Sequence, residues 1–273
     1  MALLITTAAC DSNGDNEPGA SSDSKASQNT VKAIKTVFPG LRIDSIASYK
    51  EYGNIKITYD GDLLTSYKEC YSDGKVHDGV YFTLEWDKDT ITIRNYAKTY
   101  KAAIGPNGCV NKLICPNGKV NRYEYDSDMR LLKYDRELVD INDNEQWELT
   151  WQEGNMVKGL RTYKNGANEH LYEYSGQDNK AGILNPYDRQ WWIDDSGLSE
   201  GNGINAVLYF AGVLGKGTAT LPIPSSDRYV NETYIRKYSY TYQVDTDGYV
   251  VSADFSNSYD SGVIKYFYTS KKL

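Results

Sequence analysis

The sequence predicts a mainly β protein: a single antiparallel up-and-down meander that closes into a soluble, barrel-like sheet around a short apolar helix near residues 203–214. Three observations support this fold class. Short segments of alternating apolar and polar residues recur along the chain and end in Asp or Gly turns. The chain contains 25 Tyr against 5 Phe and 5 Trp, which suits strands with one buried and one wet face. No charged residue occurs from Gly201 to Gly215.

Residues 1–9 resemble the remnant of a bacterial lipoprotein signal. They are apolar and end in small residues, and Thr7-Ala8-Ala9-Cys10 resembles a lipobox. On this interpretation Cys10 carries the lipid, the protein is held at the outer membrane or cell surface, and the folded domain is soluble. No Lys or Arg precedes the apolar run, although a signal peptide begins with a positive region. A frayed apolar N-terminus is the alternative.

Residues 10–29 form the predicted disordered acidic tether between this anchor and a single β domain over residues 30–273. Ser, Asn, Gly and acidic residues dominate the tether, so it has little to bury. Such a chain spans about 25 Å, which would hold the domain just off a membrane. Asp11, Asp15 and Glu17 also resemble an export signal for lipoproteins at the cell exterior, and a merely solvated linker is equally compatible with them.

The domain opens with a predicted amphipathic helix over Thr30–Phe38, since Val31, Ile34, Val37 and Phe38 recur at helical spacing before Pro39-Gly40. Leu41, Ile43 and Ile46 then begin the first strand. This order resembles the start of small periplasmic inhibitor-like domains. The resemblance implies an inhibitor-like or structural envelope protein as one further hypothesis.

One strand-and-turn pattern then recurs. Its copies are Ile55–Tyr59 before Asp60-Gly61-Asp62, Phe82–Trp86 before Asp87, Tyr123–Tyr125 before Asp126, Trp147–Trp151 before Gly154, and Tyr238–Tyr242 before Asp247-Gly248. Alternation closed by Asp, Asn and Gly predicts strands joined by tight hairpins. The irregular intervals between copies argue against a propeller or solenoid.

The stretch at 203–214 sets the orientation of the sheet. It is too short to cross a bilayer, which takes roughly 20 apolar residues, and it lacks a polar face, so we expect a fully enclosed helix, with a buried strand as the alternative. Enclosing it requires the apolar face of the sheet inside, the reverse of a membrane porin. The mean hydropathy of -0.61 agrees with a wet outer face.

The C-terminal half carries a resemblance to a known family. Tyr238–Tyr242, Asp247-Gly248-Tyr249-Val250 and Tyr266-Phe267-Tyr268, preceded by the apolar run and Leu221-Pro222, resemble a family of lipoproteins from gut Gram-negative bacteria. That family is catalogued as a domain of unknown function with a porin-like fold. The resemblance covers roughly residues 120–273 and is strongest over 230–273. It implies a many-stranded antiparallel barrel-like sheet and brings no catalytic residues.

Cys70, Cys109 and Cys115 follow Cys10. Cys109 and Cys115 bracket one predicted strand between two Pro-Asn-Gly turns, so about 20 Å should separate them and they should not bond each other. Cys70 could pair with either one, or all three could be reduced and buried, which we favour.

No motif in the sequence predicts an enzyme, a metal site or a cofactor. His77, in a predicted hairpin loop, and His170, beside a strand, are expected to be solvated or structural. No Gly-x-Ser-x-Gly, His-Glu-x-x-His or paired Cys-x-x-Cys occurs. Asp245-x-Asp247-Gly248 matches half of a calcium loop but lacks the later acidic ligand, so it predicts a turn.

Trp191, Trp192, Asp194, Asp195 and Glu200 form the predicted ligand site. Exposed aromatics stack on sugar rings, and two carboxylates at the right separation can hydrolyse a glycosidic bond. Loop packing is the leading interpretation of this segment, a ligand-binding platform comes next, and a catalytic pair last. Adjacent Asp194 and Asp195 face opposite ways in an extended chain, so a catalytic pair would need Glu200 or another partner.

The net charge of -7 with scattered basic residues excludes the positive stripe that nucleic-acid binding requires. The leading functional hypothesis is therefore a non-enzymatic, lipid-anchored envelope or surface protein that binds a glycan or another surface protein. A glycan-acting enzyme using carboxylates near Trp191 and Trp192 is the alternative.

Overall fold

The computed structural model describes residues 26–47, 52–71, 73–96, 98–137, 144–183, 203–229, 235–257 and 261–269. In this part of the chain sixteen strands and two helices are found, α1 (Gln28–Val37) and α2 (Ile204–Phe210). The strands are β1 (Ile43–Ala47), β2 (Tyr52–Asp60), β3 (Leu63–Tyr71), β4 (Val76–Asp87), β5 (Thr90–Asn95), β6 (Lys98–Ile104), β7 (Val110–Ile114), β8 (Val120–Tyr125), β9 (Leu131–Arg136), β10 (Glu145–Gln152), β11 (Asn155–Tyr163), β12 (Gly166–Asp178), β13 (Thr220–Tyr229), β14 (Ile235–Val244), β15 (Val250–Asn257) and β16 (Ser261–Tyr268).

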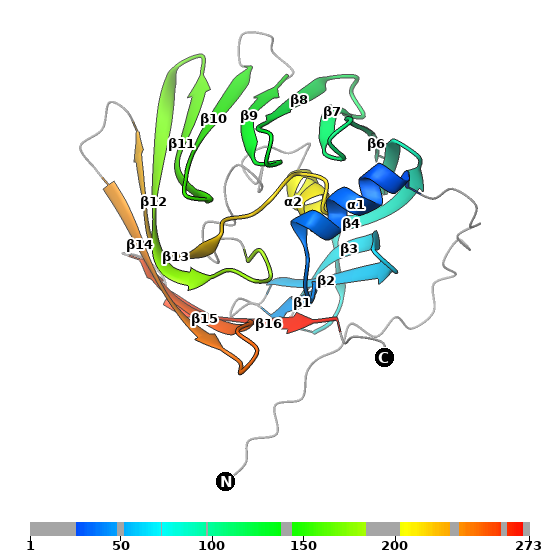
Figure 1. Ribbon diagram of the computed structural model, residues 1–273. Helices are drawn as coiled ribbons and strands as arrows, with labels where there is room; N and C mark the ends of the chain where they lie inside the picture. The colour runs from blue at the N-terminus through cyan, green and yellow to red at the C-terminus, as the bar shows by residue number, and fades with distance from the viewer. Residues whose placement is uncertain are drawn as a thin grey trace.

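The strands form one closed antiparallel barrel in chain order (Figure 1). Each strand pairs with the next, and β1 closes the ring by pairing with both β2 and β16, with Ile46 opposite Ile55 and Tyr266. The predicted up-and-down meander that closes into a barrel-like sheet is therefore confirmed.

Side chains alternate between a buried inner face and a polar outer face. On β5, Ile91 and Ile93 are fully buried, whereas Arg94, the residue after Ile93, is exposed. Opposite residues on neighbouring strands point to the same face, so each alternating segment extends one buried surface around the ring. Every segment in which the sequence predicted a strand is a strand.

Short hairpin turns gather at one end of the barrel. Gly61 and Gly248 adopt positive φ, as tight turns require. The Asp245 carboxylate accepts hydrogen bonds from the backbone N–H groups of Asp247 and Tyr249, each at 2.9 Å. This segment is therefore a turn, as predicted, with its acidic side chain bound to its own backbone.

Helix α1 lies across this turn-bearing end, in front of α2 in Figure 1. The Ser27 hydroxyl caps its first turn by accepting from the backbone N–H of Thr30, which is why the helix begins two residues before the predicted start. Backbone N–H of Ser27 donates to the carbonyl of Lys88, and Lys35 pairs with Asp62 at 3.1 Å. These contacts attach α1 to turns that follow β2 and β4.

Helix α2 is enclosed, as the sequence predicted. Val207, Leu208 and Tyr209 have no exposed surface. The helix is shorter than the predicted 203–214 stretch, because Gly212 adopts a φ of 79° and ends it. The following residues stay buried in a turn, where the carbonyl of Val213 accepts from the backbone N–H of Val110 on β7 at 2.7 Å.

The cysteines agree with one expectation and correct another. Cys109 and Cys115 flank β7 and neither forms a disulfide, so they do not bond each other. Cys70 is disulfide-bonded, so the expectation that all three thiols are reduced is wrong for Cys70. Neither Cys109 nor Cys115 is its partner.

His77 lies on β4 rather than in the predicted hairpin loop, since β4 begins at Val76 directly after a short turn.

Within the described ranges, no helix combines the length and the apolar character needed to cross a membrane.

Candidate functional site

The site predicted from the sequence lies outside the described residues. This holds for Trp191, Trp192, Asp194, Asp195 and Glu200, and also for Cys10. Their roles in ligand binding and lipidation stay predictions.

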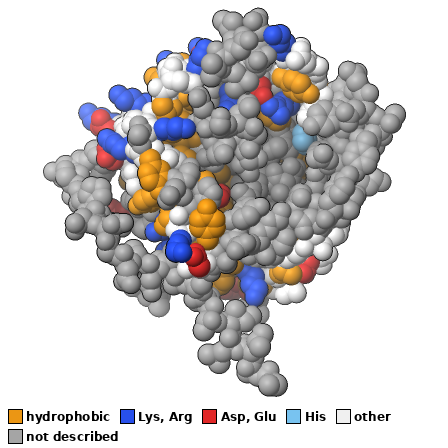
Figure 2. All heavy atoms as spheres, turned by 180° about the vertical axis from the view of Figure 1, so that it is seen from behind, with side chains coloured by type: hydrophobic (Ala, Val, Ile, Leu, Met, Phe, Trp, Pro, Cys, Tyr) orange, Lys and Arg blue, Asp and Glu red, His pale blue; other side chains and the backbone are white. Residues whose placement is uncertain are grey.

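The two helices pack against one half of the inner wall. Phe210 stacks on Tyr67 of β3 with ring centroids 6.0 Å apart, and Asn205 accepts a 2.8 Å hydrogen bond from the Tyr123 hydroxyl of β8. In the view from behind, a histidine side chain lies close to basic, acidic and hydrophobic side chains (Figure 2). The inner face of the strands beyond β8 carries polar side chains as well as apolar ones.

Strands β9 to β12 present a cluster of polar and aromatic side chains to the inside of the barrel, near the end remote from α1. We call this cluster the charged-aromatic wall. Its members share the inward register of Trp147 and Leu149, and they are Arg136, Glu145, Trp147, Arg161, Tyr163 and His170.

Strand pairing places these side chains next to one another. Glu145, the first residue of β10, is opposite Arg136, the last residue of β9. Trp147 is opposite Arg161, and residues directly opposite in an antiparallel pair point to the same face. The charged groups therefore gather where β9 ends and β10 begins.

Glu145 is a buried carboxylate shared by two guanidinium groups. It is 5% exposed, lies 3.8 Å from Nη1 of Arg136, and accepts a short hydrogen bond from Nη2 of Arg161. A buried charge is tolerated when it is paired and hydrogen-bonded, which Arg161 provides.

The guanidinium of Arg161 lies close to two aromatic rings. Its guanidinium carbon lies 5.1 Å from the centroid of the Trp147 ring and 5.4 Å from that of Tyr163. The Tyr163 hydroxyl in turn donates to Asn168 on β12 at 3.2 Å. The Nε of Arg161 is buried and has no hydrogen-bond partner. One donor of this oriented guanidinium is therefore unused.

His170 is buried on β12 at the edge of the wall. It lies opposite Gly159, which has no side chain, and its ring centroid is 6.4 Å from that of Trp147. The sequence placed His170 beside a strand, whereas it belongs to the strand and points to the inside of the barrel.

A belt of buried tyrosines on β12 to β16 continues the inner surface. Burial raises the pKa of Tyr242 well above its usual value, and the neighbouring Tyr266, Tyr240 and Tyr174 raise it further. The Tyr242 hydroxyl has no hydrogen-bond partner. Such hydroxyls stay neutral at physiological pH, so they can serve as hydrogen-bonding groups but not as bases.

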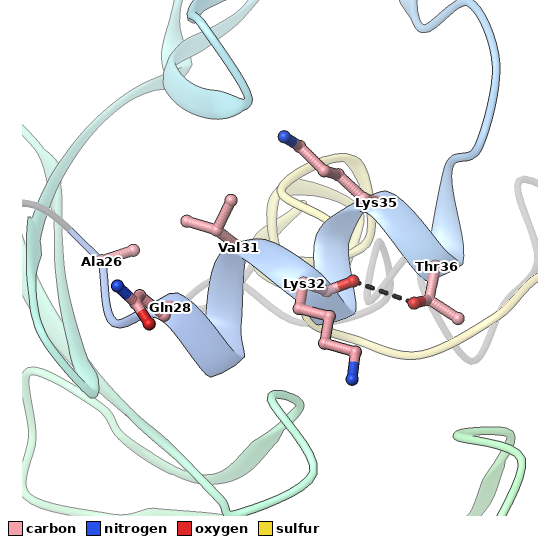
Figure 3. Close-up of a pocket in the computed structure, with 6 residues that line it drawn as sticks. All are labelled: Ala26, Gln28, Val31, Lys32, Lys35 and Thr36. Carbon is pink, nitrogen blue, oxygen red and sulfur yellow. Dashed lines mark hydrogen bonds between the residues drawn. The ribbon is translucent and has the colours of Figure 1, made fainter.

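A groove of about 440 Å³ runs along the exposed side of α1 (Figure 3). Ala26, Gln28, Val31, Lys32, Lys35 and Thr36 line it. The Lys32 and Lys35 side chains point to opposite sides of the helix in Figure 3, and Lys35 already pairs with Asp62. The groove thus does not direct its charges to one point, and the charged-aromatic wall is the stronger candidate.

Among the described residues, no group of three or more His, Cys, Asp or Glu side chains is arranged to hold a metal ion. The chemistry that the wall does offer is hydrogen bonding by an oriented guanidinium beside aromatic rings.

Sequence reasoning missed this wall. The sequence singled out Trp147–Trp151 for its aromatic face but did not follow the alternation back to Glu145, which shares the inward register of Trp147. A carboxylate in an otherwise apolar register was the available signal. Its arginine partners lie on neighbouring strands, and their pairing could not be read from spacing.

Comparison with known proteins supports the fold alone. No protein-family model matches the chain, and no curated protein matches its sequence. A porin-like protein from Bacteroides uniformis, known from a crystal structure, superposes with a TM-score of 0.65 at 14% identity, covering 83% of this chain and 98% of that one. A porin-like protein from Bacteroides vulgatus gives a TM-score of 0.54 at 16% identity, covering 84% of this chain and 99% of that one. The porin-like fold implied by the family resemblance is thereby confirmed: this chain is similar in fold to the porin-like proteins of Bacteroides.

Proposed function

We propose that this protein is a non-enzymatic envelope protein that binds a glycan inside its barrel and is held at the membrane by a lipid on Cys10. The observation that supports this proposal is the composition of the charged-aromatic wall on β9 to β12. It displays an oriented Arg161, a buried Glu145 and the ring of Trp147 where a purely structural barrel would be filled by apolar side chains. Pockets for polar ligands combine aromatic surfaces with a few fixed polar groups in this way.

Charged side chains on the outer face of the barrel favour a barrel that is surrounded by water. Outward side chains include the exposed pair Arg94–Glu85, at 2.9 Å, and the partly buried pair Lys158–Glu169, at 2.6 Å. A transmembrane barrel carries an apolar band about 25 Å tall on this surface, where Arg or Lys costs roughly 2–4 kcal/mol at the midplane. We therefore assign membrane attachment to the lipid rather than to the strands.

A thermal-shift screen of the full chain against neutral and acidic glycans tests ligand binding. A ligand that binds only the folded state, present at 100 times its Kd, stabilises that state by about 2.7 kcal/mol and raises Tm by several degrees. At least one glycan class is expected to do so. If no glycan raises Tm, glycan binding is wrong.

Chromatography of the bound glycan after prolonged incubation tests the non-enzymatic assignment. The glycan is expected to be recovered unchanged. Cleavage products would contradict the assignment and favour the alternative that places catalytic carboxylates near Trp191 and Trp192.

Intact-mass analysis of the protein from membrane fractions tests the anchor. The mature chain is expected to begin at Cys10 with a lipid on its thiol, and Cys10→Ser should release the protein from membranes while the matched Cys115→Ser should not. Cys70 is disulfide-bonded whereas Cys109 and Cys115 are not, so the competing outcome is a peptide that joins Cys10 to Cys70 by a disulfide. Finding that peptide would overturn the anchor, because one thiol cannot carry both modifications.

A further inference from the structure

We infer that one outer face of the barrel, on β16 and β1 to β4, lies against the anionic headgroups of the membrane that holds the lipid on Cys10. This inference rests on the proposed function, because it takes the anchor as given and names the surface of the domain that the bilayer contacts.

A continuous row of lysine and aromatic side chains crosses this face. Phe267 on β16 is opposite Ser45 on β1, which is in turn opposite Lys56 on β2. Lys56 is opposite Lys68 on β3, and Lys68 is opposite Tyr81 on β4. Residues directly opposite each other on neighbouring strands point to the same face of a sheet. Together with Lys265, which shares the face of Phe267 on β16, the row forms what we call the basic strip: Lys56, Lys68, Tyr81, Lys265 and Phe267.

The basic strip points away from the core. The residues next to its members along each strand are buried: Ile57, Tyr67, Phe82 and Tyr266. Successive side chains of a strand point to opposite faces, so the strip belongs to the outer surface. Lys265 is exposed, and Phe267 keeps 37% of its surface accessible.

The lysines of the strip lack a negative partner within the described part of the chain. Lys56 and Lys68 face each other, and like charges directly opposite in an antiparallel pair are destabilising. Neither they nor Lys265 form an ion pair with another described residue, and Lys68 instead lies 5.7 Å from the centroid of the Tyr81 ring. In a protein of net charge -7, this face is a local excess of positive charge that an anionic surface would balance.

The aromatic members favour a bilayer over a soluble anion. Tyrosine and other aromatic rings accumulate at the headgroup level of membranes, and lysines close to anionic lipids are attracted to their surface. The contact is peripheral, since lysines on a strand that crosses the hydrocarbon are costly. The strip therefore orients the domain on the bilayer, while the lipid retains it there.

The chain reaches the barrel on the side of the strip. Ala26 forms a bridge with Lys88 in the turn after β4, and β4 carries Tyr81. Tyr81 is six residues from the end of β4 at Asp87, or about 20 Å along the strand. Fully extended, the segment from Cys10 to Ala26 reaches roughly 50 Å. A lipid on Cys10 can thus lie in the bilayer while the strip contacts its surface.

Co-sedimentation of the full Cys10→Ser chain with vesicles tests this contact without the lipid. Vesicles of phosphatidylglycerol are expected to bind the chain at least about 10-fold more tightly than vesicles of phosphatidylcholine, because each lysine near an anionic surface adds about five-fold in affinity. Salt should abolish most of this difference, since the screening length falls from about 10 Å at 0.1 M to about 3 Å at 1 M. A salt wash therefore still releases the Cys10→Ser chain from membranes.

Two outcomes would overturn the inference. One is equal affinity for the two kinds of vesicle. The other is binding of soluble polyglutamate as tightly as of phosphatidylglycerol vesicles, which would show that the lysines attract any polyanion and that the bilayer is not the partner.

A double variant locates the contact. Lys56→Gln with Lys68→Gln is expected to weaken binding to phosphatidylglycerol vesicles at least about 10-fold. The matched control is Lys133→Gln with Lys158→Gln, which removes the same charge from β9 and β11 on the other side of the ring and should bind normally. Equal losses in the two double variants would exclude the strip and leave only the net charge of the protein.

A second pair of variants tests the aromatic contribution. Phe267→Ser is expected to weaken vesicle binding severalfold without changing the charge. Leu171→Ser is its control, because Leu171 is 43% exposed on β12, away from the strip. Unchanged binding by a folded Phe267→Ser chain would contradict the placement of this ring at the headgroups.

Failure of this inference and failure of the proposed function give different results. If Cys10 carries a lipid and the Cys10→Ser chain does not prefer anionic vesicles, the anchor stands and the inference fails. If the Cys10→Ser chain binds anionic vesicles through the strip and mass analysis finds no lipid on Cys10, the membrane contact stands and the proposed anchor fails.

Discussion

Arg42 connects three parts of the molecule through one buried side chain. Its Nη1 donates to the carbonyl of Asp62 at 2.6 Å, and its Nη2 donates to the carbonyl of Phe210 at the end of α2. The guanidinium also lies 4.0 Å from the centroid of the Tyr59 ring. The Arg42 side chain is buried, and this burial lowers its pKa. Arg42 thereby ties the β2–β3 turn to the enclosed helix.

Replacement of Arg42 by Met is expected to lower the free energy of unfolding by about 1–3 kcal/mol, because two buried carbonyls lose their donor. Urea denaturation followed by circular dichroism measures the change. The control Arg94→Met alters an exposed side chain and should stay within about 0.5 kcal/mol of the parent. Equal midpoints for the two variants would show that Arg42 has no such role.

Helix α1 depends on the absence of a side chain at Gly108. A Cβ built there would lie 2.3 Å from the Cβ of Ala33 and 3.1 Å from the carbonyl oxygen of Asn29. The turn between β6 and β7 thus approaches the helix more closely than any other residue would allow. This contact holds α1 across the end of the barrel.

The pair Gly108→Ala and Gly118→Ala isolates that contact. Both glycines have φ near 80°, so both variants incur the same backbone strain, but a Cβ at Gly118 meets nothing within 4 Å. Gly108→Ala is expected to be less stable than Gly118→Ala by about 1–3 kcal/mol, the usual cost of overpacking. Thermal unfolding compares the two variants. Equal Tm values would mean that α1 can move away from the added methyl group without loss of stability.

At the level of elements, the sequence predicted what local chemistry determines. Segments such as Trp147–Trp151 carry both the alternation and the turn residues of a strand, so their assignment needed no tertiary information. The end of α2 was harder to predict, because Gly212 ends the helix while the residues around it are as apolar as the helix itself. His77 was misplaced, since the loop before it is shorter than its polar residues suggested.

The barrel as a whole was only partly predictable. Alternation reveals which face of a strand is buried, whereas the pairing of β1 with β16 depends on strand number and stagger, which arise only when the ring forms. The charged-aromatic wall has the same origin. Glu145 and Arg161 belong to strands whose register sets their contact, and no sequence spacing encodes it.

Buried tyrosines should make the whole molecule sensitive to alkali. Burial raises the pKa of Tyr59 from 10.0 to about 12 and raises those of Tyr174, Tyr209 and Tyr266 further. The unfolded chain loses these protons near pH 10 and the folded chain does not, so stability falls as pH rises. For Tyr59 alone the loss develops between about pH 10 and 12 and approaches roughly 3 kcal/mol.

Absorbance at 295 nm and far-ultraviolet circular dichroism, recorded together from pH 8 to 13, check this expectation. The buried phenols should ionise in one cooperative step that coincides with the loss of β structure. Gradual ionisation of all tyrosines with the dichroism spectrum intact would contradict their enclosure.

The pairing of β1 with β16 has a consequence for biosynthesis. A nascent chain exposes the free edge of its earliest strand until the last strand has been made, and at about 5–20 residues per second the interval between them is roughly 10–45 s. During that time the open edge is a template for pairing with other chains. The pairing of β16 with β1 removes this edge, so the risk of misassociation is greatest before translation is complete.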